Sequence, residues 1–344
     1  MPEHDDRGWE RETGFRLRYV TRYRYDAEVA DNLNALRVRP VTHARQRVEE
    51  FSVRISPEAR LHRHDDYFGT EVIEFEVARP HRELLIDVRA FVATLPAAPP
   101  PRPDWAALAA DAYREVGAEY LLPTEEAAGH PVLADLTADT TGHRDPLELA
   151  LAVCELIPDR FEYRRGATYV DSPLVDVLDG GAGVCQDFVH LGLWLLRHHG
   201  VAARYVSGYL FTTATAGDGE AVSGSPSAGG SAQLPAAGGR PGAPEPDPRA
   251  VGGAPSEPVE VDTHAWIEVL LPEDGTDGDR GPDVRAVWVG VDPTNRGLTG
   301  ADHIKIGHGR HYADVPPVKG VYRGMANSNL EATVTMTREG PPVR

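Results

Sequence analysis

The feature that most constrains this chain is the stretch from Asp179 to Gly208. Near its start, glycines break regular structure at positions 180, 181 and 183. Apolar residues then recur at helical spacing, at Val184, Phe188, Leu191 and Leu195. This spacing predicts a buried helix that begins almost at Cys185 and stops at Gly200. The apolar, β-branched run over 201–210 predicts a strand directly after it.

The position of Cys185 indicates a reactive thiol. In the first turn of a helix, unpaired backbone N–H groups and the positive end of the dipole stabilise a thiolate, which is the nucleophilic form. The glycines before it let backbone or substrate come close to the sulfur. Simple packing is the alternative, because most free cysteines are buried apolar residues.

Length and charge narrow the class of protein. The 344 residues suffice for two domains of ordinary size, and 35 Lys and Arg against 53 Asp and Glu give a formal net charge of −18. That balance argues against a nucleic-acid partner. Two cysteines cannot build a disulfide framework. The polar start and the lack of a long apolar run predict a cytoplasmic protein with no membrane partner.

The first third of the chain alternates with a period of two. Apolar residues at every second position within 15–25, 51–55, 73–77 and 86–92 predict strands with one buried face. We therefore expect an antiparallel β-sandwich over residues 13–95, after a flexible tail at 1–12. The group His62, His64, Asp65 and Asp66 is interpreted as a solvated turn, because its spacing is irregular for metal ligands.

A proline-rich connector follows at 97–103 and marks a boundary between domains. Residues 96–140 are expected to hold this connector and short helices, one of them over 105–116. A second helix is predicted over 145–157, and Pro158 is expected to end it. Cys154 shares the apolar face of that helix, so it is interpreted as a core residue.

The remaining segment, 141–338, is expected to form a second domain. Residues 214–258 are rich in Gly, Ala, Pro and Ser and contain no aromatic residue, which predicts a disordered insertion. After it, residues 262–270 and 287–292 predict two strands. His264, Trp266 and Glu268 share one face of the first strand, and Asp292 ends the second. Hairpin pairing would bring Asp292 close to His264.

These residues supply the parts of a thiol-dependent catalytic site. A thiol nucleophile needs a base to take its proton, and the base needs a carboxylate or amide to hold its ring. Cys185, His264 and Asp292 are those three types in that order. Each alone also has a structural explanation, because a strand histidine is often a satisfied polar group and Asp-Pro is often a turn.

Several short motifs resemble the transglutaminase-like superfamily. More narrowly, they are similar to its bacterial branch with an N-terminal β-rich domain. The motifs lie in the family's order, and the resemblance spans about 14–338 apart from the insertion. They are Asp66-Tyr-Phe-Gly69, Gly183-Val-Cys-Gln-Asp-Phe188, Ala203-Arg-Tyr-Val-Ser-Gly-Tyr209, Thr263-His-Ala-Trp266, Trp288-Val-Gly-Val-Asp-Pro-Thr-Asn295 and the segment from His303 to Val315.

The resemblance implies an α+β fold. Its core would be papain-like, with the cysteine helix packed on an antiparallel sheet that carries the histidine and the aspartate. Cys185 would be the nucleophile, His264 the general acid and base, and Asp292 the residue that orients it. The Cys185 backbone N–H would be one oxyanion donor, with Gln186 and Tyr169 as candidates for the second.

Trp266 and Trp288 are expected to be core residues or groove walls. No motif for a bound cofactor occurs, so none is expected. A metal site of His303, His308 and His311 is a minor alternative, because it lacks a thiolate or carboxylate partner.

The leading hypothesis is acyl transfer on a carboxamide or peptide bond of a protein or peptide substrate, through a thioester on Cys185. A lysine amine as acceptor would make the enzyme a crosslinking acyltransferase, and water would make it a deamidase or a peptidase. The shared catalytic groups leave these outcomes open. The alternative of another class is a non-catalytic binding module that kept the fold.

Overall fold

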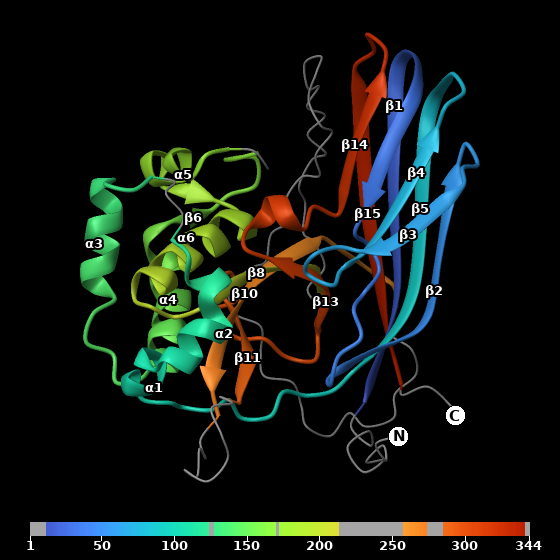
Figure 1. Ribbon diagram of the computed structural model, residues 1–344. Helices are drawn as coiled ribbons and strands as arrows, with labels where there is room; N and C mark the ends of the chain where they lie inside the picture. The colour runs from blue at the N-terminus through green and yellow to red at the C-terminus, as the bar shows by residue number, and fades with distance from the viewer. Residues whose placement is uncertain (1–11, 124–126, 170–171, 213–256, 274–284, 341–344) are drawn as a thin grey trace.

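A computed structural model describes residues 12–123, 127–169, 172–212, 257–273 and 285–340. Within them the chain forms a tall N-terminal β-structure beside a shorter α+β unit (Figure 1). The connector between these units has no helix or strand over 95–104. The predicted tail at 1–12, apart from Glu12, and nearly all of the predicted insertion at 214–258 lie outside the described residues.

The long strand β1 (Thr13–Leu36) is the centre of the first unit. Its first half pairs antiparallel with β5 (His81–Thr94) and β15 (Ser328–Glu339), and its second half with β4 (Glu71–Val77) and β14 (Val318–Arg323). The edges are β14 and three further strands, β2 (Gln46–Ser56), β3 (Leu61–Asp65) and β9 (Val259–Val261). The result is a curled eight-stranded antiparallel sheet.

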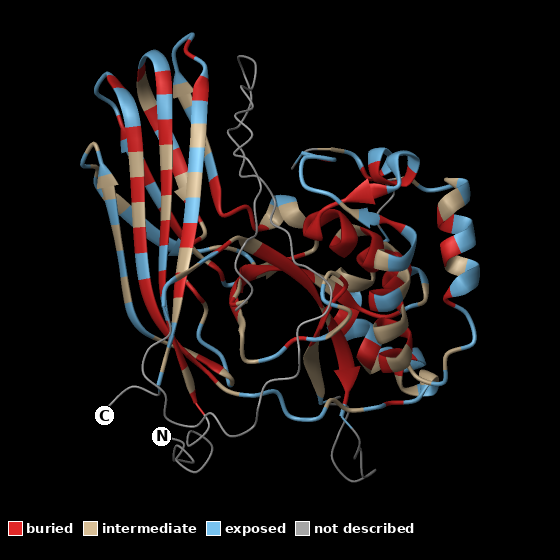
Figure 2. Cartoon of the chain, turned by 180° about the vertical axis from the view of Figure 1, so that it is seen from behind, coloured by how far each residue is buried: buried red, intermediate tan, exposed pale blue. Residues whose placement is uncertain are grey.

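The predicted alternation is the basis of the core of this sheet. Phe15, Leu17 and Tyr19 of β1 are fully buried, and they share one apolar core with Ile73 of β4 and Ile86 of β5. Buried and exposed bands alternate along these strands (Figure 2). The same core also includes Tyr209, Phe211 and Ile304 of the second unit, so the curled sheet packs on that unit.

The first unit differs from the prediction in one respect. Its strands were expected from residues 13–95 alone, and 318–338 were assigned to the second domain. In the structure β14 and β15 pair with β1, with Tyr19 opposite Val334. The physical reason is that β1 is 24 residues long and needs partners on both sides along its length.

The second unit is built on a five-stranded antiparallel sheet in the order β12-β11-β10-β8-β13. The strands are β8 (Ala203–Leu210), β10 (Thr263–Pro272), β11 (Ala286–Asp292), β12 (Gly297–Leu298) and β13 (His303–Gly309). Helix α6 (Cys185–His198) packs on this sheet, and α4 (Pro146–Arg160) packs on α6. The α+β architecture with a papain-like core is thus confirmed.

The other helices surround this core. They are α1 (Trp105–Ala109), α2 (Asp111–Leu121), α3 (Pro131–Asp139), α5 (Leu174–Gly180) and the 3₁₀ turn η2 (Tyr312–Asp314), and β6 (Glu162–Tyr163) pairs in parallel with β7 (Ala182–Gly183). The helix predicted over 105–116 is two helices, because Ala110 has an extended backbone.

The expectation that Pro158 ends its helix was wrong. Pro158 lies inside α4, which continues to Arg160. A proline so close to the end removes only one backbone hydrogen bond, so the helix continues for two more residues. Cys154 is completely buried on the inner face of α4, as predicted. Among the described residues, no helix has the length and apolar character needed to cross a bilayer.

Candidate active site

Cys185 is the first residue of α6 and is 3% exposed. The turn before it is held by Asp187, whose Oδ2 accepts the Val184 backbone N–H at 2.8 Å and the Thr168 hydroxyl at 2.5 Å. Burial raises the pKa of Asp187, and these two donors offset part of that effect. Asp187 and Thr168 are not among the site residues predicted from the sequence.

Gly183 is required by the same turn. A Cβ atom on Gly183 would lie 2.8 Å from the Asp187 carboxylate oxygen. Any side chain there would therefore displace the carboxylate that holds the start of α6. Gly183 therefore makes room for the Asp187 carboxylate. The sequence predicted a different role, in which the glycines let substrate come close to the sulfur.

His264 lies between Cys185 and Asp292. It is near the start of β10, its Nε2 is 2.7 Å from Asp292 Oδ2, and the thiol of Cys185 lies within hydrogen-bonding reach of its ring. Since Nε2 faces the carboxylate, Nδ1 is the nitrogen left to face the thiol. The structure thus brings together the three residues that the sequence singled out.

The ring and the carboxylate are both buried, with 6% and 1% of the residue exposed. Burial lowers the pKa of His264, but the negative charge of Asp292 and the hydrogen bonds outweigh it and raise this pKa to about 10. Burial opposes ionisation of Asp292, yet its pKa is well below the ordinary value because of His264. The pair therefore favours an imidazolium beside a carboxylate.

Asp292 accepts five hydrogen bonds. Its Oδ1 accepts the backbone N–H groups of Thr294 and Asn295 at 2.9 and 3.2 Å. Its Oδ2 accepts the Asn295 side-chain amide at 2.7 Å in addition to His264, and His303 Nε2 lies 3.0 Å away. The Asp-Pro-Thr-Asn turn, expected only to end a strand, therefore also fixes the carboxylate.

Trp266 closes the site from the sheet. It is 2% exposed, and its ring centroid lies 6.3 Å from that of His264 and 5.3 Å from that of His303. A Cβ atom on Gly208 of the neighbouring strand would lie 2.5 Å from the Trp266 ring. Trp266 is therefore a buried wall residue, in agreement with the expectation from sequence.

The surroundings of the thiol include three tyrosines. Burial raises the pKa of Tyr163, Tyr205 and Tyr312, and negative charge on Cys185 adds to each shift. The Tyr163 hydroxyl is buried near the Cys185 backbone N–H, whose hydrogen bond offsets part of the effect of burial on the pKa of Tyr163. Of the two candidates for the second oxyanion donor, Gln186 is buried next to the thiol and Tyr169 is 74% exposed.

A second buried polar group lies further along β10. Glu268 accepts hydrogen bonds from Arg204 and Lys305, and Lys305 Nζ lies 2.5 Å from its Oε2. Burial lowers the pKa of Lys305 to about 8 despite the carboxylate. The Arg204 guanidinium also lies 3.8 Å from the ring centroid of Trp288. Trp288 is thus a wall for a buried ion cluster, outside the thiol site.

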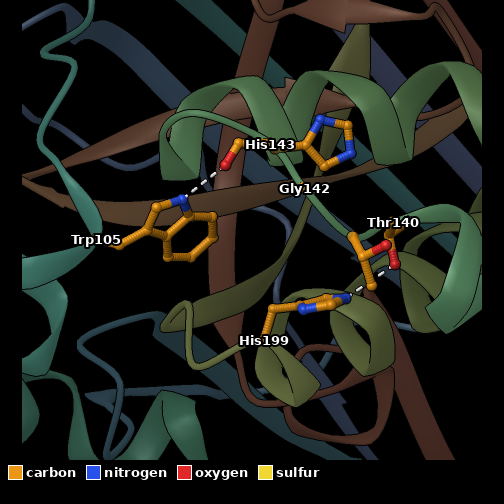
Figure 3. A pocket seen from close by; sticks show the side chains of 6 residues that line it. Trp105, Thr140, Gly142, His143 and His199 are labelled. Atoms are coloured by element: carbon orange, nitrogen blue, oxygen red, sulfur yellow. Dashed lines mark hydrogen bonds between the residues drawn. The ribbon is translucent and has the colours of Figure 1, made fainter.

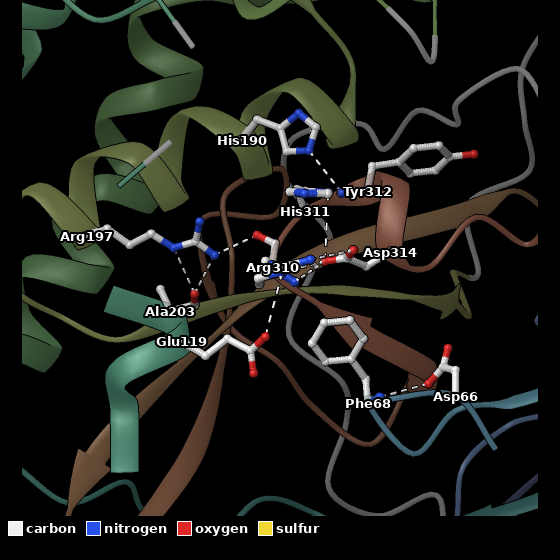
Figure 4. A network of polar contacts seen from close by, with 10 residues as sticks. All are labelled: Asp66, Phe68, Glu119, His190, Arg197, Ala203, Arg310, His311, Tyr312 and Asp314. Atoms are coloured by element: carbon white, nitrogen blue, oxygen red, sulfur yellow. Dashed lines mark hydrogen bonds and ion pairs between the residues drawn. The ribbon is translucent and has the colours of Figure 1, made fainter. Parts of the chain in front are cut away.

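The first and last motifs of the resemblance meet in space (Figure 4). Asp66 Oδ1 accepts the Phe68 backbone N–H at 3.0 Å, which forms the turn that carries the Phe68 ring. The Arg310 guanidinium lies 5.8 Å from that ring and is paired with Asp314. Arg197 of α6 donates to the Arg310 carbonyl at 2.6 Å. The N-terminal turn is therefore connected to the helix that carries the thiol.

The structure does not bring the alternative metal ligands together. His303 lies against Asp292, His308 contacts the Phe68 ring, and His311 lies 3.8 Å from Asp314. His62 and His64 are on β3 rather than in a turn, where Glu74 of β4 joins them, and their potential ligand atoms lie within 4.8 Å of one another. All three of these side chains are exposed.

A small pocket of about 260 Å³ lies away from the thiol (Figure 3). The His199 ring binds the Thr140 hydroxyl at 2.9 Å, and Trp105 donates to the His143 carbonyl at 2.8 Å. His199 caps the C-terminal end of α6, whose N-terminal end carries Cys185. A 14-residue helix is about 21 Å long, so this pocket is not part of the thiol site.

Fold and site together define a protein with a cysteine-based catalytic fold, in which a helix with an N-terminal thiol packs on a sheet with an imidazole and a carboxylate. The chain belongs to the transglutaminase-like superfamily. Residues 134–293 match the core of that superfamily, and residues 15–93 match the bacterial transglutaminase-like N-terminal region. The resemblance inferred from the motifs is therefore confirmed.

Similar proteins match most of the chain. An uncharacterized protein of Mycobacterium leprae is 30% identical, over 94% of this chain and 99% of its own. An uncharacterized protein of Mycobacterium tuberculosis is 29% identical over 93% and 91%. The crystal structure of a "Putative Cysteine Protease" from Cytophaga hutchinsonii has a TM-score of 0.64 at 18% identity, over 94% of this chain and 90% of that one. That likeness shows a shared fold.

Proposed function

We propose that the protein is a cysteine acyltransferase that acts on a carboxamide or peptide carbonyl of a protein or peptide. The observation that carries this proposal is the position of the His264 ring, which has the Cys185 thiol on one side and Asp292 Oδ2 at 2.7 Å on the other. This is the order of nucleophile, base and orienting carboxylate that thiol catalysis needs.

In the first step the thiol proton is held on His264 as part of the imidazolium, and the thiolate sulfur attacks the carbonyl carbon. The Cys185 backbone N–H at the start of α6 is the donor available to the oxyanion. His264 then protonates the leaving ammonia or amine as the C–N bond breaks, which leaves a thioester on Cys185. Asp292 stabilises the imidazolium during both transfers.

In the second step an acceptor resolves the thioester. The acceptor loses a proton to His264 as it attacks, and the proton returns to the sulfur when the C–S bond breaks. An amine acceptor forms a new amide and completes acyl transfer. A lysine side chain is an acceptor of that kind. Hydrolysis by the same groups would instead give a deamidase or peptidase.

The test is incubation of the full chain with casein and a fluorescent primary amine. We expect incorporation of the amine, with a loss of about 10³-fold or more in Cys185→Ala. Cys154→Ala is the matched control and should retain activity, because burial raises the pKa of the Cys154 thiol well above its ordinary value and leaves it inert.

Other outcomes are distinguishable in the same assay. Ammonia release without incorporation would indicate a deamidase, and new N-termini in casein would indicate a peptidase. If none of these occurs and iodoacetamide labels Cys185 no faster than Cys154, the proposal is wrong and a non-catalytic binding module is the better description.

A further inference from the structure

The carboxylate of Asp292 is shared by two histidines. His264 Nε2 and His303 Nε2 lie 2.7 and 3.0 Å from the same oxygen, Oδ2. Both rings are largely buried, with 5% and 10% of the side chain exposed. The two imidazoles come from different strands, β10 and β13, which lie on either side of β8. If Asp292 only oriented His264, its carboxylate would need no contact with a second imidazole.

The hydrogen bonds of His303 define its tautomer. The backbone N–H of Gly300 donates to His303 Nδ1 at 3.2 Å. A nitrogen that accepts a hydrogen bond carries no proton, so the proton of the ring is on Nε2. His303 is therefore a neutral imidazole that donates Nε2–H to Asp292.

The ring of His303 is held on its other side as well. Trp266 meets it edge to face, with ring centroids 5.3 Å apart. The start of β13 is fixed by the Phe211 backbone N–H, which donates to the Asp302 carbonyl at 3.0 Å. Because the His303 ring is held in this way, its N–H can reach the Asp292 carboxylate from one direction only.

We propose that His303 is a positioning residue. Its neutral ring donates a hydrogen bond that fixes the orientation of Asp292 Oδ2, so that this oxygen can accept the hydrogen bond from His264 Nε2–H. The inference rests on the proposed function of Cys185 and His264. A neutral donor suits this task because Asp292 keeps its full negative charge for the imidazolium, whereas a second cation would compete for it. The Gly300 N–H occupies Nδ1, which leaves Nε2–H as the ring's donor to Asp292.

The test compares two substitutions at one position. His303→Gln keeps a neutral N–H donor at a similar reach, and His303→Leu keeps the bulk without the donor. We expect kcat of His303→Leu to fall about 10- to 100-fold with KM unchanged, and His303→Gln to stay within about 10-fold of the wild-type value. The rate of Cys185 alkylation by iodoacetamide should follow the same order, without any need for a substrate.

His308→Leu is the matched control, because it removes an imidazole from the same strand that does not contact Asp292. The thermal stability of His308→Leu should show how much stability is lost when an imidazole is removed from β13. Its kcat should stay within about threefold of the wild-type value. If His303→Leu does not fold, nitrogen-15 NMR of the wild-type protein still tests the inference. The spectrum should show His303 with its proton on Nε2.

Two results would overturn the inference alone. One is a His303→Leu variant with wild-type kcat and wild-type Cys185 alkylation. The other is a folded His303→Gln variant as impaired as His303→Leu, which would indicate packing rather than hydrogen bonding. Failure of the proposed function looks different, because wild-type Cys185 would then react no faster than Cys154 in the first place.

Discussion

Gln46 and Lys305 form a reciprocal hydrogen-bonded pair between the N-terminal sheet and the central sheet. The Gln46 side-chain amide donates to the Lys305 carbonyl at 2.8 Å, and the Lys305 backbone N–H donates to Gln46 Oε1 at 2.8 Å. The same Gln46 amide donates to the Val41 carbonyl at 2.7 Å. Gln46 is 1% exposed, so one side chain satisfies buried backbone groups of both units.

Gln46→Leu should therefore destabilise the protein. The substitution leaves the buried N–H of Lys305 without the Gln46 oxygen and removes one of the two donors to its C=O, at a cost of about 1–3 kcal/mol. The measurement is thermal and urea unfolding. Ser52→Val, at an exposed position of the same strand, is the control and should change little. Equal unfolding curves for Gln46→Leu and wild type would show that this pair does not stabilise the contact between the sheets.

Asp292→Asn should change the pH dependence of stability. Asp292 raises the pKa of His264 from 6.5 to about 10, so between these values the folded protein binds more protons than the unfolded chain. The free energy of unfolding should therefore lose the contribution of this histidine as the pH rises from about 6.5 to about 10. In Asp292→Asn that fall should disappear, because burial alone lowers the pKa of His264.

Urea unfolding of both proteins at several pH values from 6 to 10 would test this prediction. The difference between the two pH profiles isolates His264, since Lys305 titrates in both proteins. Asp292→Asn should also lower kcat, by up to about 10⁴-fold, because an amide can orient the ring but does not supply the negative charge that stabilises the imidazolium. A pH profile parallel to that of wild type would contradict the assigned pairing.

Glu268→Leu should be among the most destabilising substitutions in the central sheet. It leaves Lys305 and Arg204 with no carboxylate between them, and removal of one partner of a buried ion pair costs about 3–5 kcal/mol. The double variant Glu268→Leu, Lys305→Met should recover part of this loss, as measured by urea unfolding. Glu76→Leu, at an exposed position of β4, is the control. Equal losses in the single and double variants would argue against the ion cluster.

Gly208→Ala should disturb the wall of the site. A Cβ atom there would lie 2.2 Å from the Ile304 carbonyl oxygen and 2.5 Å from the Trp266 ring, and the backbone cannot turn aside as a side chain does. We expect a loss of about 1–3 kcal/mol in stability and a change in tryptophan fluorescence. Gly180→Ala is the control, because its Cβ would meet nothing within 4 Å. Unchanged fluorescence and stability in Gly208→Ala would show that the strands can separate to accept a methyl group.

Local patterns predicted much of the fold. The start of α6 at Cys185 follows from glycines before an apolar helical spacing, and both signals lie within a few residues. The approach of Asp292 to His264 was predicted from the pairing of two strands that are neighbours in the central sheet. The alternation in β1 predicted its buried face in the same way.

Patterns of this kind failed where a contact joins distant segments. The sequence near residue 330 carries no sign that it pairs with β1, more than 300 residues earlier. The pattern around Asp187 predicted only that it lies in the first turn of a helix. In the structure its carboxylate holds the turn before the nucleophile. His303 was considered only as a metal ligand, and its position on Asp292 depends on how β13 pairs with β8.

Local patterns were enough to predict which residue types could perform thiol chemistry and which helix and strands carry them, because periodicity and turn residues act over short distances along the chain. Three features required the three-dimensional arrangement. They are the nitrogen of His264 that faces the carboxylate, the second imidazole on that carboxylate, and the last strand that completes the first sheet. These depend on distances between side chains of separate strands, and a chain's periodicity contains no information about such distances.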